Sequence, residues 1–155
     1  MSQELRIKEV AQTETVREHL GELSALSAQI ADEMSSQISA LADRVLNTIR
    51  SGGKIMFCGN GGSAADAQRL ATEYVVRFAR ERKALPALAL TTDTSLLTAA
   101  ANDYGYETVF ARQVEALGRS GDLLVMHSTS GESDNLFAAA HSARDAGIAT
   151  VALLA

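Results

Sequence analysis

The chain has 155 residues, of which 46% are apolar and 21% charged, a balance that suits one globular domain and argues against extensive disorder. Its net charge of -5 disfavours general nucleic-acid binding, which needs a basic surface, yet leaves room for a small anion held by local donors. No run of about 18 apolar residues predicts a membrane span. The single cysteine, Cys58, and a first segment unlike a signal peptide predict a cytoplasmic protein.

Residues from about 4 to 50 are predicted to be helical. Apolar residues recur there at helical spacing, namely Leu20, Leu23, Leu26, Ile30, Met34, Ile38, Leu41, Val45 and Ile49. The serines within residues 24–27 leave open a break into two helices. A long amphipathic helix rarely buries its apolar stripe alone, so we expect a partner subunit to cover this one.

Beyond Ser51-Gly52-Gly53, which should end the helix, short apolar segments alternate with helical ones. The predicted strands are residues 54–58, 87–90, 123–126 and 148–154, and the predicted helices are residues 64–80, 93–101, 107–117 and 134–146. This alternation predicts an α/β fold, a three-layer sandwich with a mostly parallel sheet behind a helical amino-terminal arm. In such sheets, ligands bind beyond the carboxyl ends of the strands.

A glycine-rich loop follows the first predicted strand, at residues 58–63 (CGNGGS). Glycines allow a tight turn and a close ligand, and the helix that follows offers N–H groups suited to phosphate or sugar oxygens. Ser63 either caps that helix or donates to the ligand. The loop is no Walker motif, and it matches a dinucleotide fingerprint only weakly, with Ala64 at the third glycine position. A plain strand-to-helix turn is the competing interpretation.

A hydroxyl-rich loop follows the third predicted strand, at residues 128–133 (STSGES). Hydroxyl groups and exposed N–H groups at a helix start can surround a phosphate without lysine or arginine. The alternative is an ordinary helix cap, but a cap needs one hydroxyl and this loop has four. Since both loops lie between a strand and a helix, we expect a phosphorylated sugar to bind between them.

These stretches together resemble the sugar isomerase (SIS) family and, within it, the phosphoheptose isomerases. The matching stretches are residues 58–68 (CGNGGSAADAQ), 90–94 (LTTDT), 101–105 (ANDYG) and 128–131 (STSG). The resemblance runs from about Ser51 onwards and implies an SIS domain at residues 51–155, with residues 1–50 as an arm that makes oligomer contacts. It implies a cytoplasmic homotetramer that interconverts sedoheptulose 7-phosphate and D-glycero-D-manno-heptose 7-phosphate for surface polysaccharide.

The resemblance also implies roles for individual residues. Glu73 would be the catalytic base that moves a proton between C1 and C2 through an enediol. The implied substrate-binding residues are Asn60, Gly61, Gly62, Ser63, Arg77, Asn102, Asp103, Ser128, Thr129, Ser130 and Ser133.

The sequence departs from the family pattern in two places. The family has a zinc-binding histidine one helical turn before Glu73, where this chain has Arg69, which offers a metal no lone pair. Zinc at Glu73 is therefore questionable. The family also continues past the fourth strand into a helix that bears a glutamine and a histidine of the site, whereas this sequence stops at Ala155, so we expect a carboxyl-terminal helical part to be missing.

Several residues keep more than one interpretation. Glu73 lies ten residues after Ser63, so it either serves a neighbouring subunit's loop or an inward-facing cleft, or forms a surface pair with Arg69. His127 fits a site role, a satisfied core position or a cleft wall equally. Cys58 is favoured as a small core residue over a nucleophile.

Two rival functions accompany the isomerase. The first is a non-catalytic SIS protein that senses a sugar phosphate or joins replication initiation; Arg69 favours it, whereas Glu73 favours an enzyme. The second, a dinucleotide-binding oxidoreductase fragment, would need an acidic residue where Leu90 ends the second strand.

Overall fold

A computed structural model describes the backbone of residues 3–154 and the side chains of residues 13–154. The chain divides into a first unit that ends at Asp43 and a second that begins at Arg44. The first unit is part of one long helix. The second contains the last turns of that helix and the whole α/β domain.

Helix α1 (Gln3–Arg50) is continuous, so the break considered at residues 24–27 is absent. Ser27 lies within the helix, where its hydroxyl donates to the Leu23 carbonyl at 2.8 Å. The predicted end is confirmed. Gly52 adopts φ +85°, and Gly53 N–H donates to Thr48 O at 2.9 Å, the bonding pattern of a glycine-terminated helix.

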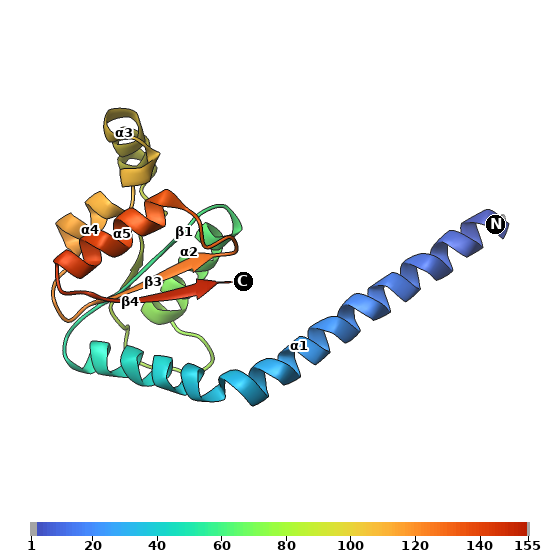
Figure 1. Cartoon of the computed structure of the whole chain (residues 1–155). Coiled ribbons are helices and arrows are strands. Elements are labelled where there is room, and N and C mark those ends of the chain that lie inside the picture. The colour runs from blue at the N-terminus through green and yellow to red at the C-terminus, as the bar shows by residue number, and fades with distance from the viewer. Residues whose placement is uncertain (1–2, 155) are drawn as a thin grey trace. The chain divides into compact units, whose positions relative to one another are not determined.

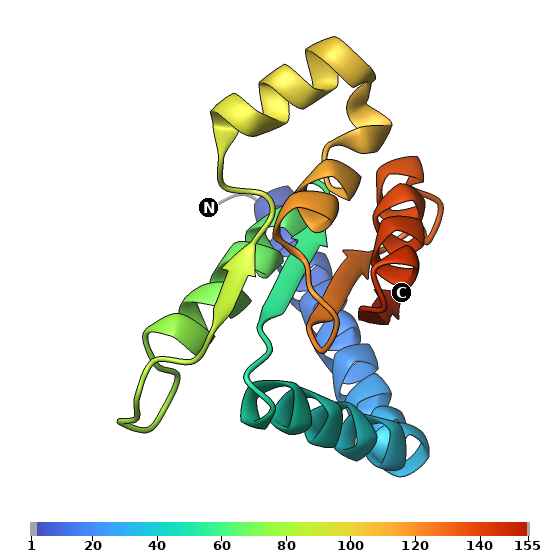
Figure 2. The ribbon, with the colours of Figure 1, turned by 90° about the vertical axis from the view of Figure 1, so that its left-hand side faces the viewer.

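Four parallel strands form one sheet in the order β2–β1–β3–β4 (Figures 1 and 2). Their bounds are Ile55–Gly59 for β1, Ala87–Ala89 for β2, Leu123–Ser128 for β3 and Ala149–Leu154 for β4. Each strand lies within a residue or two of its predicted segment. The core strands β1 and β3 are buried on both faces, as expected of a parallel sheet.

Helices cover both faces of the sheet, which confirms the three-layer sandwich (Figure 1). On one face α2 (Gly62–Val75) and the last turns of α1 pack against Phe57 and Val125. On the other face α4 (Ala111–Leu117) and α5 (Asp134–Asp145) pack against Met56 and Leu124. Neighbouring residues of each strand alternate between these two cores, as the pleat requires.

Helix α2 ends at Val75, so the prediction of a helix to residue 80 is wrong. Arg82 folds back and donates to the carbonyls of Tyr74 at 2.8 Å and Glu73 at 2.5 Å, and Leu85 N–H also donates to Tyr74 O. These carbonyls therefore do not need the N–H groups of a further helical turn. Arg82 thus takes the place of a further helical turn at these two carbonyls.

The predicted helix at residues 107–117 is also shorter than expected. A 3-10 turn, η1 (Tyr106–Thr108), follows α3 (Thr94–Tyr104), and α4 begins only at Ala111. Gly105 causes this corner with φ +92°, a conformation that favours glycine. Asp93, predicted as the first helical residue, is instead the cap of α3 and accepts from Leu96 N–H at 2.9 Å.

A carboxylate holds the amino end of the sheet together. Asp122, just before β3, accepts backbone N–H groups of Lys54 at 2.9 Å and Arg119 at 2.8 Å, and it forms an ion pair with the Lys54 ammonium. Burial alone would raise the pKa of Asp122, but these hydrogen bonds and the charge of Lys54 outweigh it and hold the pKa below its ordinary value.

Among the described helices, none is long and apolar enough to cross a membrane. Several apolar side chains in the first unit are more than half exposed in this single chain, namely Val16, Leu20, Leu23 and Leu26. The three leucines belong to the apolar stripe that the sequence predicts, and Val16 precedes it.

Candidate functional site

The two predicted ligand loops lie side by side at the carboxyl end of the sheet. Strands β1 and β3 are neighbours, and Gly59 at the end of β1 is in register with His127 of β3. The glycine loop (residues 59–63) and the hydroxyl loop (residues 128–133) therefore start from adjacent points on one edge. This arrangement agrees with the expected position of a ligand site in a parallel sheet.

Glycine is required at two positions of the glycine loop. A Cβ atom on Gly59 would lie 2.7 Å from Ser63 Cβ and 2.9 Å from the His127 carbonyl oxygen, so a side chain would collide with the glycine loop itself and with β3. Gly61 has φ +56°, which strains any residue with a side chain. Gly62 meets nothing within 4 Å, so it is not needed for steric reasons.

The start of α2 directs N–H groups into this region. The N–H groups of Ala64 and Ala65 donate to the Gly61 carbonyl, whereas those of Gly62 and Ser63 precede any possible acceptor within the helix. Gly61 is the cap residue and no side chain caps the helix, so Ser63 does not play the capping role considered for it. Its N–H and hydroxyl groups suit a ligand oxygen.

The hydroxyl loop is only partly explained as a helix cap. Ser128 Oγ accepts from Gly131 N–H at 3.0 Å and Ser130 Oγ accepts from Glu132 N–H at 3.3 Å, so both serines shape the loop. Ser133 occupies the cap position of α5, but its side chain makes no capping hydrogen bond. Its hydroxyl is therefore available to a ligand, as is that of exposed Thr129.

Negative charge lies close to the hydroxyl loop. Glu132 and Asp134 flank Ser133, and both side chains are exposed. An anion bound here gains from the start of α5 but is opposed by the two carboxylates.

The sequence did not predict a bridge between the two loops. Asn60 Nδ2 donates to Asn135 Oδ1, and Asn135 Nδ2 donates back to Asn60 Oδ1, both at 2.9 Å. The hydroxyl of Tyr106 donates to the same Asn60 oxygen at 3.1 Å. The only local signal for Asn135 is an asparagine inside a predicted helix, where it is not a favoured residue.

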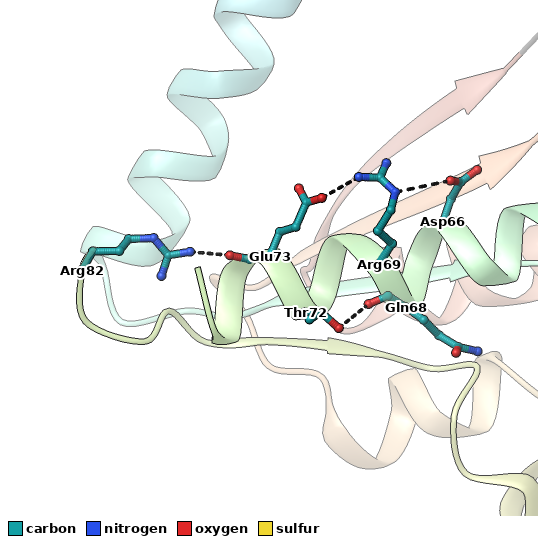
Figure 3. Close-up of polar contacts among 6 residues, drawn as sticks. All are labelled: Asp66, Gln68, Arg69, Thr72, Glu73 and Arg82. Carbon is teal, nitrogen blue, oxygen red and sulfur yellow. Dashed lines mark hydrogen bonds and ion pairs between the residues drawn. The ribbon is translucent and has the colours of Figure 1, made fainter. Parts of the chain in front are cut away.

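Glu73 lies near the far end of α2, away from both loops. Ten residues of helix separate it from Ser63, about 15 Å along the axis. Arg69 donates to Glu73 Oε1 at 2.6 Å, and its Nε lies 3.8 Å from Asp66 Oδ1 (Figure 3). The pairing of Glu73 with Arg69, the plainer of its two interpretations, is therefore present. Within one chain Glu73 and the loops are not brought together.

The residues around Glu73 do not fit a zinc ion. The guanidinium of Arg69 donates a hydrogen bond to the carboxylate of Glu73. It remains protonated and has no lone pair for a metal. Nor do the described residues include any group of three histidine, cysteine or acidic side chains placed to bind a metal. The reaction at Glu73 is therefore considered through the carboxylate alone.

Three other predicted residues lie outside the two loops. Asn102 and Asp103 are exposed near the end of α3, where Asn102 donates to Asp103 at 2.8 Å, and Asp103 lines a hollow between α3 and α4. Arg77 lies beyond α2, with its Nε 3.8 Å from Glu81. Their roles in substrate binding stay predictions.

His127 is buried, but it is not the satisfied core histidine considered above. Its Nε2 has no hydrogen-bond partner in the described structure, and its ring lies 6.2 Å from that of Phe57. Burial, joined by the charge of Arg69 and opposed by that of Asp66, lowers the pKa of His127. Cys58 is a core residue as predicted, since burial raises the pKa of its thiol to about 12 and makes it a poor nucleophile.

Curated proteins similar to this chain include phosphoheptose isomerases. One from Roseiflexus sp. is 62% identical over 120 residues, covering 77% of this chain and 61% of that protein. One from Nitratidesulfovibrio vulgaris is 53% identical over 138 residues, covering 89% of this chain and 66% of that protein. The chain thus spans a little over six tenths of the length of these relatives.

Solved structures lead to the same family. A phosphoheptose isomerase from Neisseria gonorrhoeae superposes with a TM-score of 0.86 at 42% identity, over 92% of this chain and 74% of that one. One from Francisella tularensis gives a TM-score of 0.88 at 33% identity, over 92% and 75%. The SIS domain family matches residues 18–155. The chain therefore belongs to the SIS domain family and, within it, groups with the phosphoheptose isomerases.

Proposed function

We propose that this chain binds sedoheptulose 7-phosphate between the glycine loop and the hydroxyl loop and is part of an isomerase that converts it to D-glycero-D-manno-heptose 7-phosphate. The observation that carries this proposal is the meeting of the two loops at adjacent ends of β1 and β3. The N–H groups at the starts of α2 and α5 and the hydroxyls of Ser63 and Ser133 suit the phosphate. The named relatives support the substrate.

In the proposed reaction, Glu73 removes a proton from one carbon to give an enediol and returns it to the neighbouring carbon. A fixed carboxylate of this kind contributes about a 100- to 10,000-fold rate increase. Because Glu73 lies far along α2 from the loops of its own chain, we propose that it serves a loop of a neighbouring subunit.

A homo-oligomer follows from this proposal, and we propose a cytoplasmic homotetramer. The exposed apolar stripe of α1, which includes Leu20 and Leu23, supplies a contact surface. Light scattering on a Leu20→Glu/Leu23→Glu variant tests the role of the stripe, because loss of the oligomer is expected if the stripe forms the contact. An unchanged mass would contradict it.

One observation favours a second candidate, a non-catalytic sugar-phosphate sensor. Arg69 donates a hydrogen bond to Glu73, so the carboxylate already has a partner within the chain. A sensor would retain the loops and need no free base.

One experiment separates the two candidates. The purified protein is incubated with sedoheptulose 7-phosphate, with and without zinc, and product formation is followed by NMR. For an isomerase, we expect turnover that falls at least about 100-fold in Glu73→Gln. The control Glu115→Gln, an exposed residue of α4, should keep full activity. No turnover by the wild type, with equal sugar-phosphate affinity in the wild type and Glu73→Gln, would favour the sensor.

A further inference from the structure

Three segments that are distant in sequence meet at the side-chain amide of Asn60. The reciprocal bonds with Asn135 join the glycine loop to the first turn of α5, directly after the hydroxyl loop. The Tyr106 hydroxyl joins the same amide to the corner between α3 and η1. Asn60 is half-buried and Asn135 is 3% exposed, so the amide pair is largely shielded from water.

The hydrogen-bond capacity of these groups limits what Asn60 can do. Its Oδ1 has two lone pairs, and Asn135 and Tyr106 take both. Its Nδ2 has two N–H groups, one of which donates to Asn135. Asn60 can therefore offer a sugar at most one N–H and no acceptor. Asn60 is therefore chiefly a bridge, with one N–H left for the sugar contact that the resemblance implies.

We propose that Asn135 and Tyr106 are positioning residues, which act through Asn60 to hold the glycine loop, the hydroxyl loop and the α3–η1 corner in the arrangement that binds the sugar phosphate. The corner carries the predicted substrate residues Asn102 and Asp103, so the Tyr106 bond ties them to the two loops. This inference rests on the proposed function for the identity of the ligand. The bridge itself depends only on the contacts at Asn60.

Tyr106 provides the cleanest test because its side chain is 58% exposed. Removing the hydroxyl alone in Tyr106→Phe keeps the ring and leaves the core intact. Tyr104, two residues earlier and 56% exposed, is a matched control. It contacts Arg112 through its ring, whose centroid lies 4.1 Å from the guanidinium carbon, and Tyr104→Phe keeps that ring.

The first measurement needs no ligand. Hydrogen–deuterium exchange is followed in peptides that cover residues 59–64 in the wild type, Tyr106→Phe, Tyr104→Phe and Asn135→Ala. Loss of one net hydrogen bond predicts about a threefold to tenfold faster exchange in Tyr106→Phe. Asn135→Ala should exchange faster still, and Tyr104→Phe should match the wild type. Equal exchange in the two tyrosine variants overturns the bridge, even if Asn135→Ala fails to fold.

The second measurement asks whether the bridge positions the ligand. For sedoheptulose 7-phosphate, Tyr106→Phe should raise KM and Kd about fivefold with kcat within about twofold. A purely structural role would lower the melting temperature without raising KM and Kd while kcat stays nearly constant. A Kd equal to that of Tyr104→Phe overturns the positioning role. If the wild type does not bind the sugar phosphate, the proposed function and the positioning role both fail. The difference in hydrogen–deuterium exchange between Tyr106→Phe and Tyr104→Phe still tests whether the bridge exists.

Discussion

The two ends of the parallel sheet differ in how their polar groups are used. At the amino end, the carboxylate of Asp122 accepts hydrogen bonds from the backbone N–H groups of Lys54 and Arg119, so it has its partners within the chain. At the carboxyl end, the starts of α2 and α5 present N–H groups, and Ser133 caps no helix with its side chain. The comparison indicates that the amino end contributes stability, whereas the carboxyl end keeps donors for a ligand.

The largest expected effect tests the stabilising end. Asp122→Ala removes the acceptor of two backbone N–H groups and the partner of Lys54, and should lower the free energy of unfolding by about 3 kcal/mol. The pKa of Asp122 lies below its ordinary value, so this contribution is present at neutral pH and is lost as the pH falls through the folded-state pKa. Urea unfolding at pH 7 measures it.

Asp145→Ala is the control for this prediction. Asp145 forms an exposed pair with Arg144, and such pairs contribute less than about 1 kcal/mol. Equal losses in the two variants would show that the amino end has no special role in stability.

The next largest effect concerns the glycine loop. Gly59→Ala places a Cβ against Ser63 and the His127 carbonyl and should cost about 2–3 kcal/mol, together with ligand affinity. Gly62→Ala, three residues on, meets no neighbour and should be neutral or slightly stabilising in the helix. Thermal unfolding and ligand titration of both variants check this contrast, and an equally stable Gly59→Ala would disprove the close approach.

A smaller effect isolates binding from stability. Ser133→Ala removes a hydroxyl that makes no capping bond, so the melting temperature should stay nearly constant while affinity for the sugar phosphate falls about tenfold. Ser120→Ala, an exposed residue at the amino end, should change neither. Calorimetric titration gives both affinities. Unchanged binding by Ser133→Ala would place the phosphate elsewhere.

The smallest effect concerns His127, a residue of β3 in register with Gly59. Because burial lowers its pKa, the unfolded chain takes up a proton first as the pH falls below about 6.5, and stability declines on acidification. His127→Phe should show a weaker loss between neutral and mildly acidic pH, whereas His141→Gln, on the exposed surface of α5, should behave as the wild type. Unfolding curves over that pH range provide the comparison.

Local patterns in the sequence predicted most of the sheet and its helices. The apolar runs gave strands within a residue or two, and the helix ends at Gly52 and Gly147 follow from positive φ angles that favour glycine. The early end of α2 was not predictable, because it depends on Arg82 returning to the carbonyls of Glu73 and Tyr74. No local sequence pattern indicates such a contact.

The candidate site, too, was only partly predictable from the sequence. Both loops were identified because glycine and hydroxyl residues follow apolar strands, a local signal. The bridge from Asn60 to Asn135 and Tyr106 spans 75 and 46 positions in the chain, so only the folded structure brings these side chains together. His127 was placed at the strand end, but its unpaired Nε2 depends on the packing around it.

The most direct test of ligand binding at the carboxyl end is amide chemical-shift mapping by NMR with sedoheptulose 7-phosphate. We expect the amides of Gly62, Ser63 and the hydroxyl loop to shift on titration, while those of Lys54 and Arg119 at the amino end stay in place. Sedoheptulose without the phosphate should produce much smaller shifts. Shifts confined to the amino end, or none at saturating sugar phosphate, would contradict the assignment of the ligand site to these two loops.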